Sequence, residues 1–251
     1  MDNLPELTGN IPAIAIGFIM EKRIEIEKQV ADGCPSYAMI YMEADVTNGP
    51  VSDDLKLEFG RLTGSMTELY EVADINKRPP IAATRKAYKI FGKDPNRYRP
   101  SQEQLMRRVV RGLGLYDVSA LVDSGNMLSL ATGWSVGVFD RDKIAGDLIR
   151  LGVGREGEEY EGIGRGPLNI KGLPVLRDEI GGFGTPTSDH ERTRTEQDTC
   201  HISVTLHVFD SAGEDLEAIE RMMRDIFTRH CAARNIETEV VRHKSTNAKE
   251  Q

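Results

Sequence analysis

The stretch GFGTPTSDHERTRTEQDT, residues 182–199, gathers hydroxyl, carboxylate, imidazole and guanidinium groups with almost no apolar side chain. Such a composition is typical of a solvated surface loop or of the rim of a site. Ser188, Asp189 and His190 are the residue types of a hydrolytic triad, but they are consecutive, and adjacent side chains cannot form a relay from nucleophile to base to orienting acid. We therefore expect no serine nucleophile in this loop.

Two further motifs suggest chemistry less strongly. The stretch GIGRGPLN, residues 162–169, leads into a proline rather than a helix, so it indicates a cluster of turns and not a phosphate-binding loop. His201 and His207 lie six positions apart in one segment, and His190 precedes them, but no metal-ligand spacing such as His-x-His or Cys-x-x-Cys occurs. We expect no metal and no cofactor.

Composition limits the class of protein. The chain has 251 residues, of which 39% are hydrophobic and 29% are charged, as in a globular protein. Its three cysteines have no metal-type spacing, and their odd number argues against a disulfide framework, which indicates a reducing compartment. The longest apolar run, residues 11–20, is too short to span a bilayer and lacks the basic start of a signal peptide. We expect a cytoplasmic protein with no membrane contact.

Basic residues concentrate in residues 85–111, although the whole chain has a net charge of -8. This segment contains nine basic and two acidic residues, a net charge of +7. A concentrated basic stretch on an acidic protein can bind a phosphate-bearing partner, or it can be a solvated helix face. Electrostatics alone favours the solvated face.

Hydrophobic periodicity predicts the elements that must position these groups. Helices are expected over residues 51–75, 99–114, 140–152 and 214–235, and strands over residues 11–20, 167–170, 173–178 and 200–209. Residues 36–42 form a second apolar element. Ser52 is expected to cap the first helix, and Ser101 with Gln104 to form a capping box on the second. The elements do not alternate regularly, which predicts an α+β fold, a single compact domain of mixed β-sheets flanked by helices.

The expected domain covers residues 1–251, with a core over about 80–241. An N-terminal strand and helix, residues 1–79, should pack on this core, and the polar tail 242–251 should be mobile. In the strand at 200–209 every second residue is apolar, so Ser203, Thr205 and His207 should share a polar face.

Residues 121–146, LVDSGNMLSLATGWSVGVFDRDKIAG, resemble the B3/B4 editing module of the bacterial phenylalanyl-tRNA synthetase β subunit. The matching positions are Val122, Asp123, Asn126, Met127, Leu128, Gly133, Phe139, Asp140, Asp142, Lys143, Ile144 and Gly146. Residues 154–164 and 180–210 resemble the second half of the module, and the collinear resemblance covers about residues 115–210. The stretches at 84–101 and 186–193 look more like freestanding proteins of this kind.

The resemblance implies hydrolysis of the ester between a wrong amino acid and tRNA, without a Ser or Cys nucleophile. Such a site binds the reactive ester, holds a water in line and offers donors to the developing oxyanion. We expect Thr187, Ser188 and Asp189 to form the catalytic group. The expected substrate-binding residues are Asn126, Gly182, Gly184, Arg192, Ser203, Thr205 and His207, and the expected tRNA-binding residues are Arg85, Lys86, Lys89, Arg97, Arg99, Arg107, Arg108 and Arg111.

Two positions depart from the family. Gly137 stands where synthetase-linked members usually carry a histidine, and Trp134 stands where the family tends to have a polar side chain, which should reshape the pocket. His207 is a candidate substitute for the missing histidine. If none replaces it, the alternative is a non-catalytic module of the same fold that binds an amino acid or tRNA.

Overall fold

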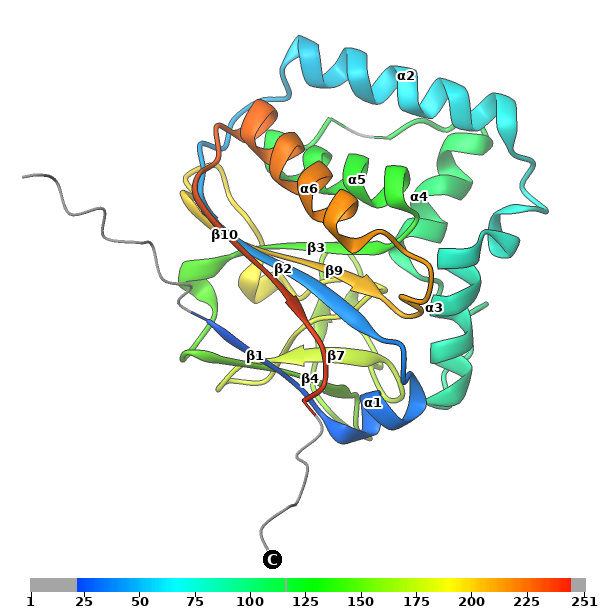
Figure 1. Ribbon diagram of the computed structural model, residues 1–251, viewed down its shortest axis with the longest axis vertical. Helices are drawn as coiled ribbons and strands as arrows, with labels where there is room; N and C mark the ends of the chain where they lie inside the picture. The colour runs from blue at the N-terminus through cyan, green and yellow to red at the C-terminus, as the bar shows by residue number, and fades with distance from the viewer. Residues whose placement is uncertain (1–21, 116, 245–251) are drawn as a thin grey trace, which may run out of the picture.

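The computed structural model describes residues 22–115 and 117–244 (Figure 1). Two four-stranded sheets pack face to face, and helices cover the outer face of one of them. Phe139 of one sheet meets Phe183 of the other edge to face, with ring centroids 5.0 Å apart. The expected α+β fold of mixed sheets flanked by helices is confirmed.

The helix-covered sheet is antiparallel throughout and has the order β10-β2-β9-β3. Its strands are β2 (Ala38–Asp45), β3 (Ser135–Asp140), β9 (His201–Val208) and β10 (Arg234–Val241). β2 is a central strand and pairs with β9 along its whole length. The N-terminal part of the chain therefore shares the core of the later segments.

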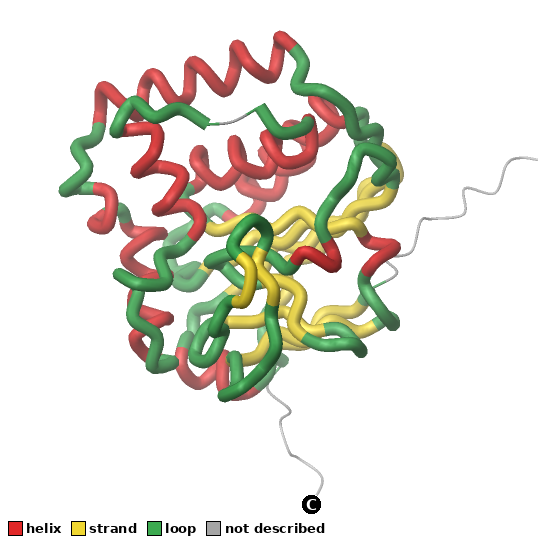
Figure 2. The backbone as a smooth tube through the Cα atoms, turned by 180° about the vertical axis from the view of Figure 1, so that it is seen from behind, coloured by secondary structure: helices red, strands yellow, loops and turns green. Residues whose placement is uncertain are grey.

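The second sheet has the order β1-β4-β7-β8, and only its β1–β4 pair is parallel. Its strands are β1 (Arg23–Ile26), β4 (Leu148–Val153), β7 (Pro174–Arg177) and β8 (Gly182–Gly184). A small hairpin consists of β5 (Glu161–Gly162) and β6 (Gly166–Pro167). Figure 2 views this side of the molecule, where long loops join the strands.

The helices belong mainly to the other side of the first sheet (Figure 1). They are α1 (Lys28–Gly33), α2 (Asp53–Leu69), α3 (Pro79–Ile90), α4 (Ser101–Val110), α5 (Ala120–Thr132) and α6 (Leu216–Cys231). Three single turns complete the fold, namely η1 (Ile75–Lys77), η2 (Arg141–Lys143) and η3 (Glu191–Thr193). No helix in the described ranges is long and apolar enough to cross a membrane.

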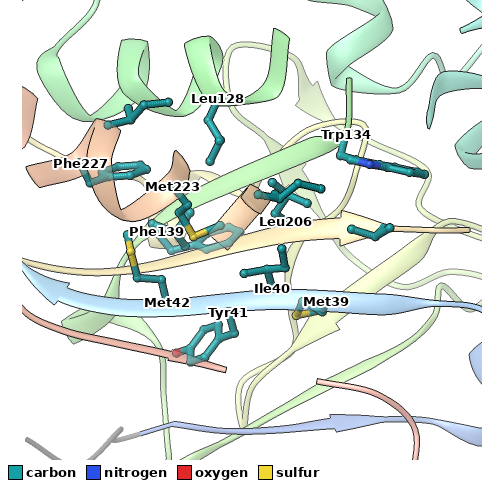
Figure 3. Packing of buried hydrophobic residues seen from close by; sticks show 14 of the residues in the cluster. Met39, Ile40, Tyr41, Met42, Leu128, Trp134, Phe139, Leu206, Met223 and Phe227 are labelled. Carbon is teal, nitrogen blue, oxygen red and sulfur yellow. The ribbon is translucent and has the colours of Figure 1, made fainter. Parts of the chain in front are cut away.

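The core lies between the first sheet and the helices α5 and α6. Leu128 of α5 and Met223 and Phe227 of α6 cover the sheet, whereas Tyr41 of β2 points away from these helices (Figure 3). The apolar residues of β9 face the helices, as their alternation predicts. The polar face of β9 packs against the second sheet and is as buried as the apolar one.

The predicted helix over residues 51–75 is correct in its start and wrong in its end. The Ser52 hydroxyl accepts a hydrogen bond from the Leu55 amide, as expected for an N-cap. The helix ends at Leu69, which is 74% exposed, because Tyr70 takes an extended conformation. The prolines that follow, Pro79 and Pro80, occupy the first turn of α3, where the missing backbone N–H of a proline costs no hydrogen bond.

Two other predictions about helices were wrong. Pro100 rather than Ser101 precedes α4, and the Gln104 amide donates to the Arg99 carbonyl instead of completing a capping box. The expected helix over 140–152 is a single turn, η2, followed by strand β4. Gly146 at φ +73° turns the chain out of η2, and residues 148–153 then pair with β1 and β7.

The strand over 167–170 was also placed too late: β6 is Gly166–Pro167. Strand β10 was missed, because its apolar residues are few. The expected strand over 11–20 and most of the expected mobile tail lie outside the described residues.

Candidate functional site

A cavity of about 550 Å³ lies between α5, β3 and the loop that follows Asp189. Its apolar lining comes from five side chains on three segments, Val118, Val122, Val136, Val138 and Ile163. Val136 and Val138 are two apart on β3 and so share the face that meets α5. The volume falls within the usual range for small-molecule sites.

Helix α5 brings Asn126 to this cavity. Ser119 caps the helix by accepting a hydrogen bond from the Val122 amide, and Asn126 follows Val122 by four residues, on the same helical face. A Cβ at Gly125 would lie 2.7 Å from a methyl of Val138. Glycine at this position therefore lets the helix lie close to β3, which brings Asn126 near the valine wall.

The cavity lining has two carboxylates, Asp189 and, at the rim, Glu196. The turn before Asp189 is held by the Thr185 hydroxyl, which accepts from the Thr187 and Ser188 amides and donates to the Ser188 carbonyl. Burial raises the pKa of Asp189 to about 8, partly offset by a hydrogen bond from the Thr185 backbone. In the part of the chain that the structure describes, no cation pairs with this carboxyl, which leaves it open to a ligand.

The rim of the cavity is polar and comes from residues 194–197. Glu196 pairs with both Arg194 and Lys143, so the rim carries its own ion pairs and is tied to η2. The cavity thus combines an apolar wall with one acid that has no paired cation among the described residues and with the side-chain amides of Asn126 and Gln197, the features expected of a site for a small amphiphilic ligand.

The other two expected catalytic residues point elsewhere. The Thr187 hydroxyl is buried and lies 2.9 Å from the Tyr88 hydroxyl. The Ser188 hydroxyl is 3.5 Å from the Asp189 carbonyl, and neither side chain is part of the cavity lining. Both side chains support the loop that carries Asp189.

Gly182, Gly184 and Arg192 were expected to bind substrate, and the structure gives them structural contacts instead. The two glycines are buried in β8 beside β7, and a Cβ at Gly184 would lie 2.7 Å from the Phe139 ring. Arg192 makes a bidentate pair with Asp178, with N–O distances of 2.8 and 3.1 Å. These residues lie outside the cavity lining because packing and pairing within the fold occupy them.

Ser203, Thr205 and His207 lie between the two sheets, and not on a pocket floor. The Ser203 hydroxyl is 2.9 Å from the Tyr41 hydroxyl, and Nδ1 of His207 is 2.7 Å from the Tyr37 hydroxyl. Burial lowers the pKa of His207 to about 3, so this imidazole is neutral. Its position inside the sandwich argues against a role as a substitute histidine.

The two departures from the family pattern also lie away from the cavity. Gly137 is on the face of β3 opposite to Val136 and Val138, and a Cβ there would lie 2.5 Å from the Phe139 ring. A histidine at this position would displace that ring and would not face the cavity. The expectation that Trp134 reshapes the pocket is wrong, because this side chain is buried in the core and absent from the lining.

Residues 133–137, GWSVG, match the Gly-x-Ser-x-Gly pattern of a nucleophile elbow. Its Ser135 is the first residue of β3 and is 1% exposed. The hydroxyl donates to the Gln102 side chain, and no sharp turn presents it to solvent. It is therefore not a nucleophile elbow.

The basic segment divides into two groups. Arg85 and Arg107 pair with the fully buried Glu103 at 2.8 and 2.9 Å, and Arg99 approaches it at 3.5 Å. Arg108 donates to the Gly114 carbonyl. The basic residues on the surface are Lys86, Lys89, Arg97 and Arg111. Some of the basic residues that suggested a phosphate-binding surface therefore neutralise the buried Glu103 instead.

Comparison with known proteins places the chain in a class. Residues 83–247 match the family described as the B3/4 domain, and the chain belongs to this family. It is 33% identical over 110 residues to the phenylalanine–tRNA ligase β subunit of Bartonella quintana, and 32% identical over 111 residues to that of Bartonella henselae. Each match covers 43% of this chain and 14% of the relative, so the chain spans a small part of these proteins.

A solved structure is also similar. It is an N-terminal fragment of the phenylalanyl-tRNA synthetase β subunit from Pyrococcus horikoshii, with a TM-score of 0.46 at 13% identity. The match covers 90% of this chain and 56% of that one.

Proposed function

We propose that this protein hydrolyses the ester of a mischarged aminoacyl-tRNA, with the amino acid bound in the cavity of Asn126 and Asp189. The observation that carries the proposal is the meeting of these two side chains beside a valine wall. Membership of the B3/4 family and similarity to two tRNA ligase β subunits support it.

The parts of the cavity match the parts of an aminoacyl ester. Val122, Val136 and Val138 offer an apolar surface to an amino-acid side chain. The α-ammonium group binds beside Asp189, and its charge lowers the pKa of that carboxyl and keeps it ionised. Asn126 has amide protons for the ester carbonyl. The ligand therefore supplies the cation that Asp189 lacks among the described residues.

The reaction needs positioning more than a strong nucleophile, because an aminoacyl ester is already reactive. Water attacks the carbonyl carbon, and the Asn126 amide donates to the oxyanion that develops. The ester C–O bond then breaks, one proton of the attacking water goes to the departing ribose oxygen and the other to solvent, and the amino acid departs as its carboxylate. Asp189 holds the ammonium group through these steps.

The RNA part of the substrate carries phosphates, and the surface basic residues are candidates to bind them. Lys86, Lys89, Arg97 and Arg111 keep their charges at the surface, unlike the arginines around Glu103. We assign tRNA contact to these four residues. This assignment narrows the eight basic residues that the sequence suggested.

A second function is a non-catalytic amino-acid-binding module. Among the described residues the cavity lining contains no histidine, cysteine or serine, which favours this alternative. Its side chains of the general-base type are Asp189 and Glu196, and Glu196 is already paired with Arg194 and Lys143. In this alternative the same cavity binds a free amino acid and no bond is broken.

The test is release of amino acid from a panel of mischarged tRNAs at low salt. Wild type should release one amino acid well above the spontaneous rate. Asp189→Asn should lower kcat/KM about 100-fold, the usual cost of losing one group that contacts the transition state. Asp198→Asn is the matched control, since Asp198 is exposed in the same loop and outside the lining, and it should behave as wild type.

No release across the panel would contradict hydrolysis. A melting temperature raised by one free amino acid in wild type, and not in Asp189→Asn, would then support the binding module. Equal activity of wild type and Asp189→Asn would exclude this cavity as the site.

A further inference from the structure

Three metal-ligating side chains that do not line the cavity meet at η2 and the start of β9: Asp142, Cys200 and His201. Asp142 belongs to η2, and His201 begins β9 directly after Cys200. One ligand atom from each lies within 4.8 Å of the other two. Nδ1 of His201 is 2.9 Å from the Asp142 carboxylate and 3.8 Å from the Cys200 sulfur.

These distances suit a shared cation. Around a tetrahedral Zn²⁺ with its usual bond lengths, sulfur, nitrogen and oxygen ligands lie about 3.4–3.6 Å from one another. The two observed separations lie on either side of that range, so small side-chain movements bring the three atoms onto one ion. Thiolate, imidazole and carboxylate together form a donor set typical of Zn²⁺.

A cysteine–histidine–aspartate relay does not explain the cluster. In such a relay the imidazole accepts the thiol proton on one nitrogen and donates to the carboxylate from the other. Here Cys200 and Asp142 both approach Nδ1 of His201. The ligand atoms of Cys200 and Asp142 therefore lie on the same side of the imidazole, as ligands of one shared ion do.

The surroundings position the ligands. Asp45 lies on the other side of the imidazole, with a carboxylate oxygen 3.8 Å from Nε2 of His201. The Asn235 side-chain amide donates a hydrogen bond of 2.7 Å to the Asp45 carboxylate and so fixes its position. A metal-bound histidine commonly hydrogen-bonds a carboxylate through its second N–H, and Asp45 stands on that side of the ring at a distance longer than a hydrogen bond. Asp140 accepts hydrogen bonds from the Asp142 amide and the Thr199 hydroxyl, and so ties η2 to the residue before Cys200.

We propose that Asp142, Cys200 and His201 bind a Zn²⁺ ion, with water as the fourth ligand. Binding forms the metal–sulfur bond and releases the Cys200 thiol proton to solvent. The ion would join η2 to the start of β9, at the end of the loop whose residues 194–197 line the cavity. The proposal stands apart from the deacylation chemistry.

The test uses Co²⁺ as a spectroscopic probe on the full chain, reduced and stripped with a chelator. One equivalent of Co²⁺ should produce the thiolate charge-transfer and visible d–d bands of tetrahedral coordination, and Zn²⁺ should abolish both. Cys200→Ser should lose the charge-transfer band. His201→Gln and Asp142→Asn should weaken affinity at least 10-fold, and Asp45→Asn about 10-fold through the orientation of the imidazole.

Asp147→Asn is the matched control, because Asp147 is an exposed acid close in sequence to Asp142 and should bind as wild type. In chelator all variants should melt alike, which establishes that they fold, and Zn²⁺ should raise the melting temperature only where the site is intact. A wild-type chain without these bands at one equivalent would overturn the proposal. A charge-transfer band that survives Cys200→Ser, in which the buried Cys34 and Cys231 remain, would also overturn it.

Discussion

Glu103 and Asp189 are both acids withdrawn from solvent, and their surroundings differ. Glu103 is fully buried between Arg85 and Arg107, with Arg99 at the edge of the group. Asp189 faces a cavity, and burial raises its pKa to about 8. A buried acid that pairs with cations of its own chain, such as Glu103, has a structural role, whereas a buried acid without such a cation, such as Asp189, is a candidate to bind a ligand.

The polar loop at 182–199 repeats this contrast along its own length. Before Asp189, the polar groups of Thr185, Thr187 and Ser188 bind the backbone or a neighbouring tyrosine. Beyond this point Asp189 and residues 194–197 line the cavity, whereas Arg192 between them pairs with Asp178. The two halves of the loop have similar composition, but the polar side chains of the first half stabilise the loop and those of the second half contribute to the candidate site.

The largest expected effect is on the stability provided by Glu103. Glu103→Gln leaves two partly buried arginines without their acid, and we expect the free energy of unfolding to fall by about 3–5 kcal/mol in urea titrations. Glu156→Gln, in an exposed pair with Lys171, should cost less than about 1 kcal/mol. If both variants lowered the free energy of unfolding equally, Glu103 would contribute no more to stability than a surface acid does.

Next comes the division of the basic segment. Replacing Lys86, Lys89, Arg97 and Arg111 together with glutamine should weaken tRNA binding, and should reduce the slope of log K against log salt by about 3 if each contacts one phosphate. Stability should change little, because these side chains are exposed. Arg107→Gln should show the reverse, a less stable chain with nearly unchanged binding. Binding that depends on Arg107 instead would contradict our assignment.

The pH dependence of stability tests Asp189 directly. The folded state keeps the Asp189 proton up to about pH 8, whereas the unfolded chain loses it near the ordinary pKa of 3.8. Wild type should therefore lose stability relative to Asp189→Asn as the pH rises from about 4 to about 8. Melting temperatures across this range measure the difference. Parallel curves would mean that Asp189 is already ionised and compensated.

The smallest expected effect is that of Ser188→Ala. The hydroxyl lies outside the lining, so deacylation should change less than about 2-fold, against about 100-fold for Asp189→Asn in the same assay. A large loss of deacylation activity in Ser188→Ala would show that Ser188 belongs to the site and not to the supporting part of the loop.

Much of the local structure could be predicted, and the site only in part. The start of α2, the apolar face of α6 and the alternation of β9 follow from period and capping residues. Asn126 and Asp189 were both named from the family resemblance, and the cavity unites them. Ser203, Thr205 and His207 were named on the same basis and lie elsewhere, because alternation identifies a shared face and not what covers it.

The sequence by itself determined the α+β class, the B3/4 resemblance and the residues that share each helix or strand face. Only the tertiary structure decided that a second sheet covers the polar face of β9, that Arg85 and Arg107 neutralise Glu103, and that Asp142 meets Cys200 and His201. The physical reason is that periodicity is a property of neighbours along the chain. Burial and pairing depend on segments that only folding brings together.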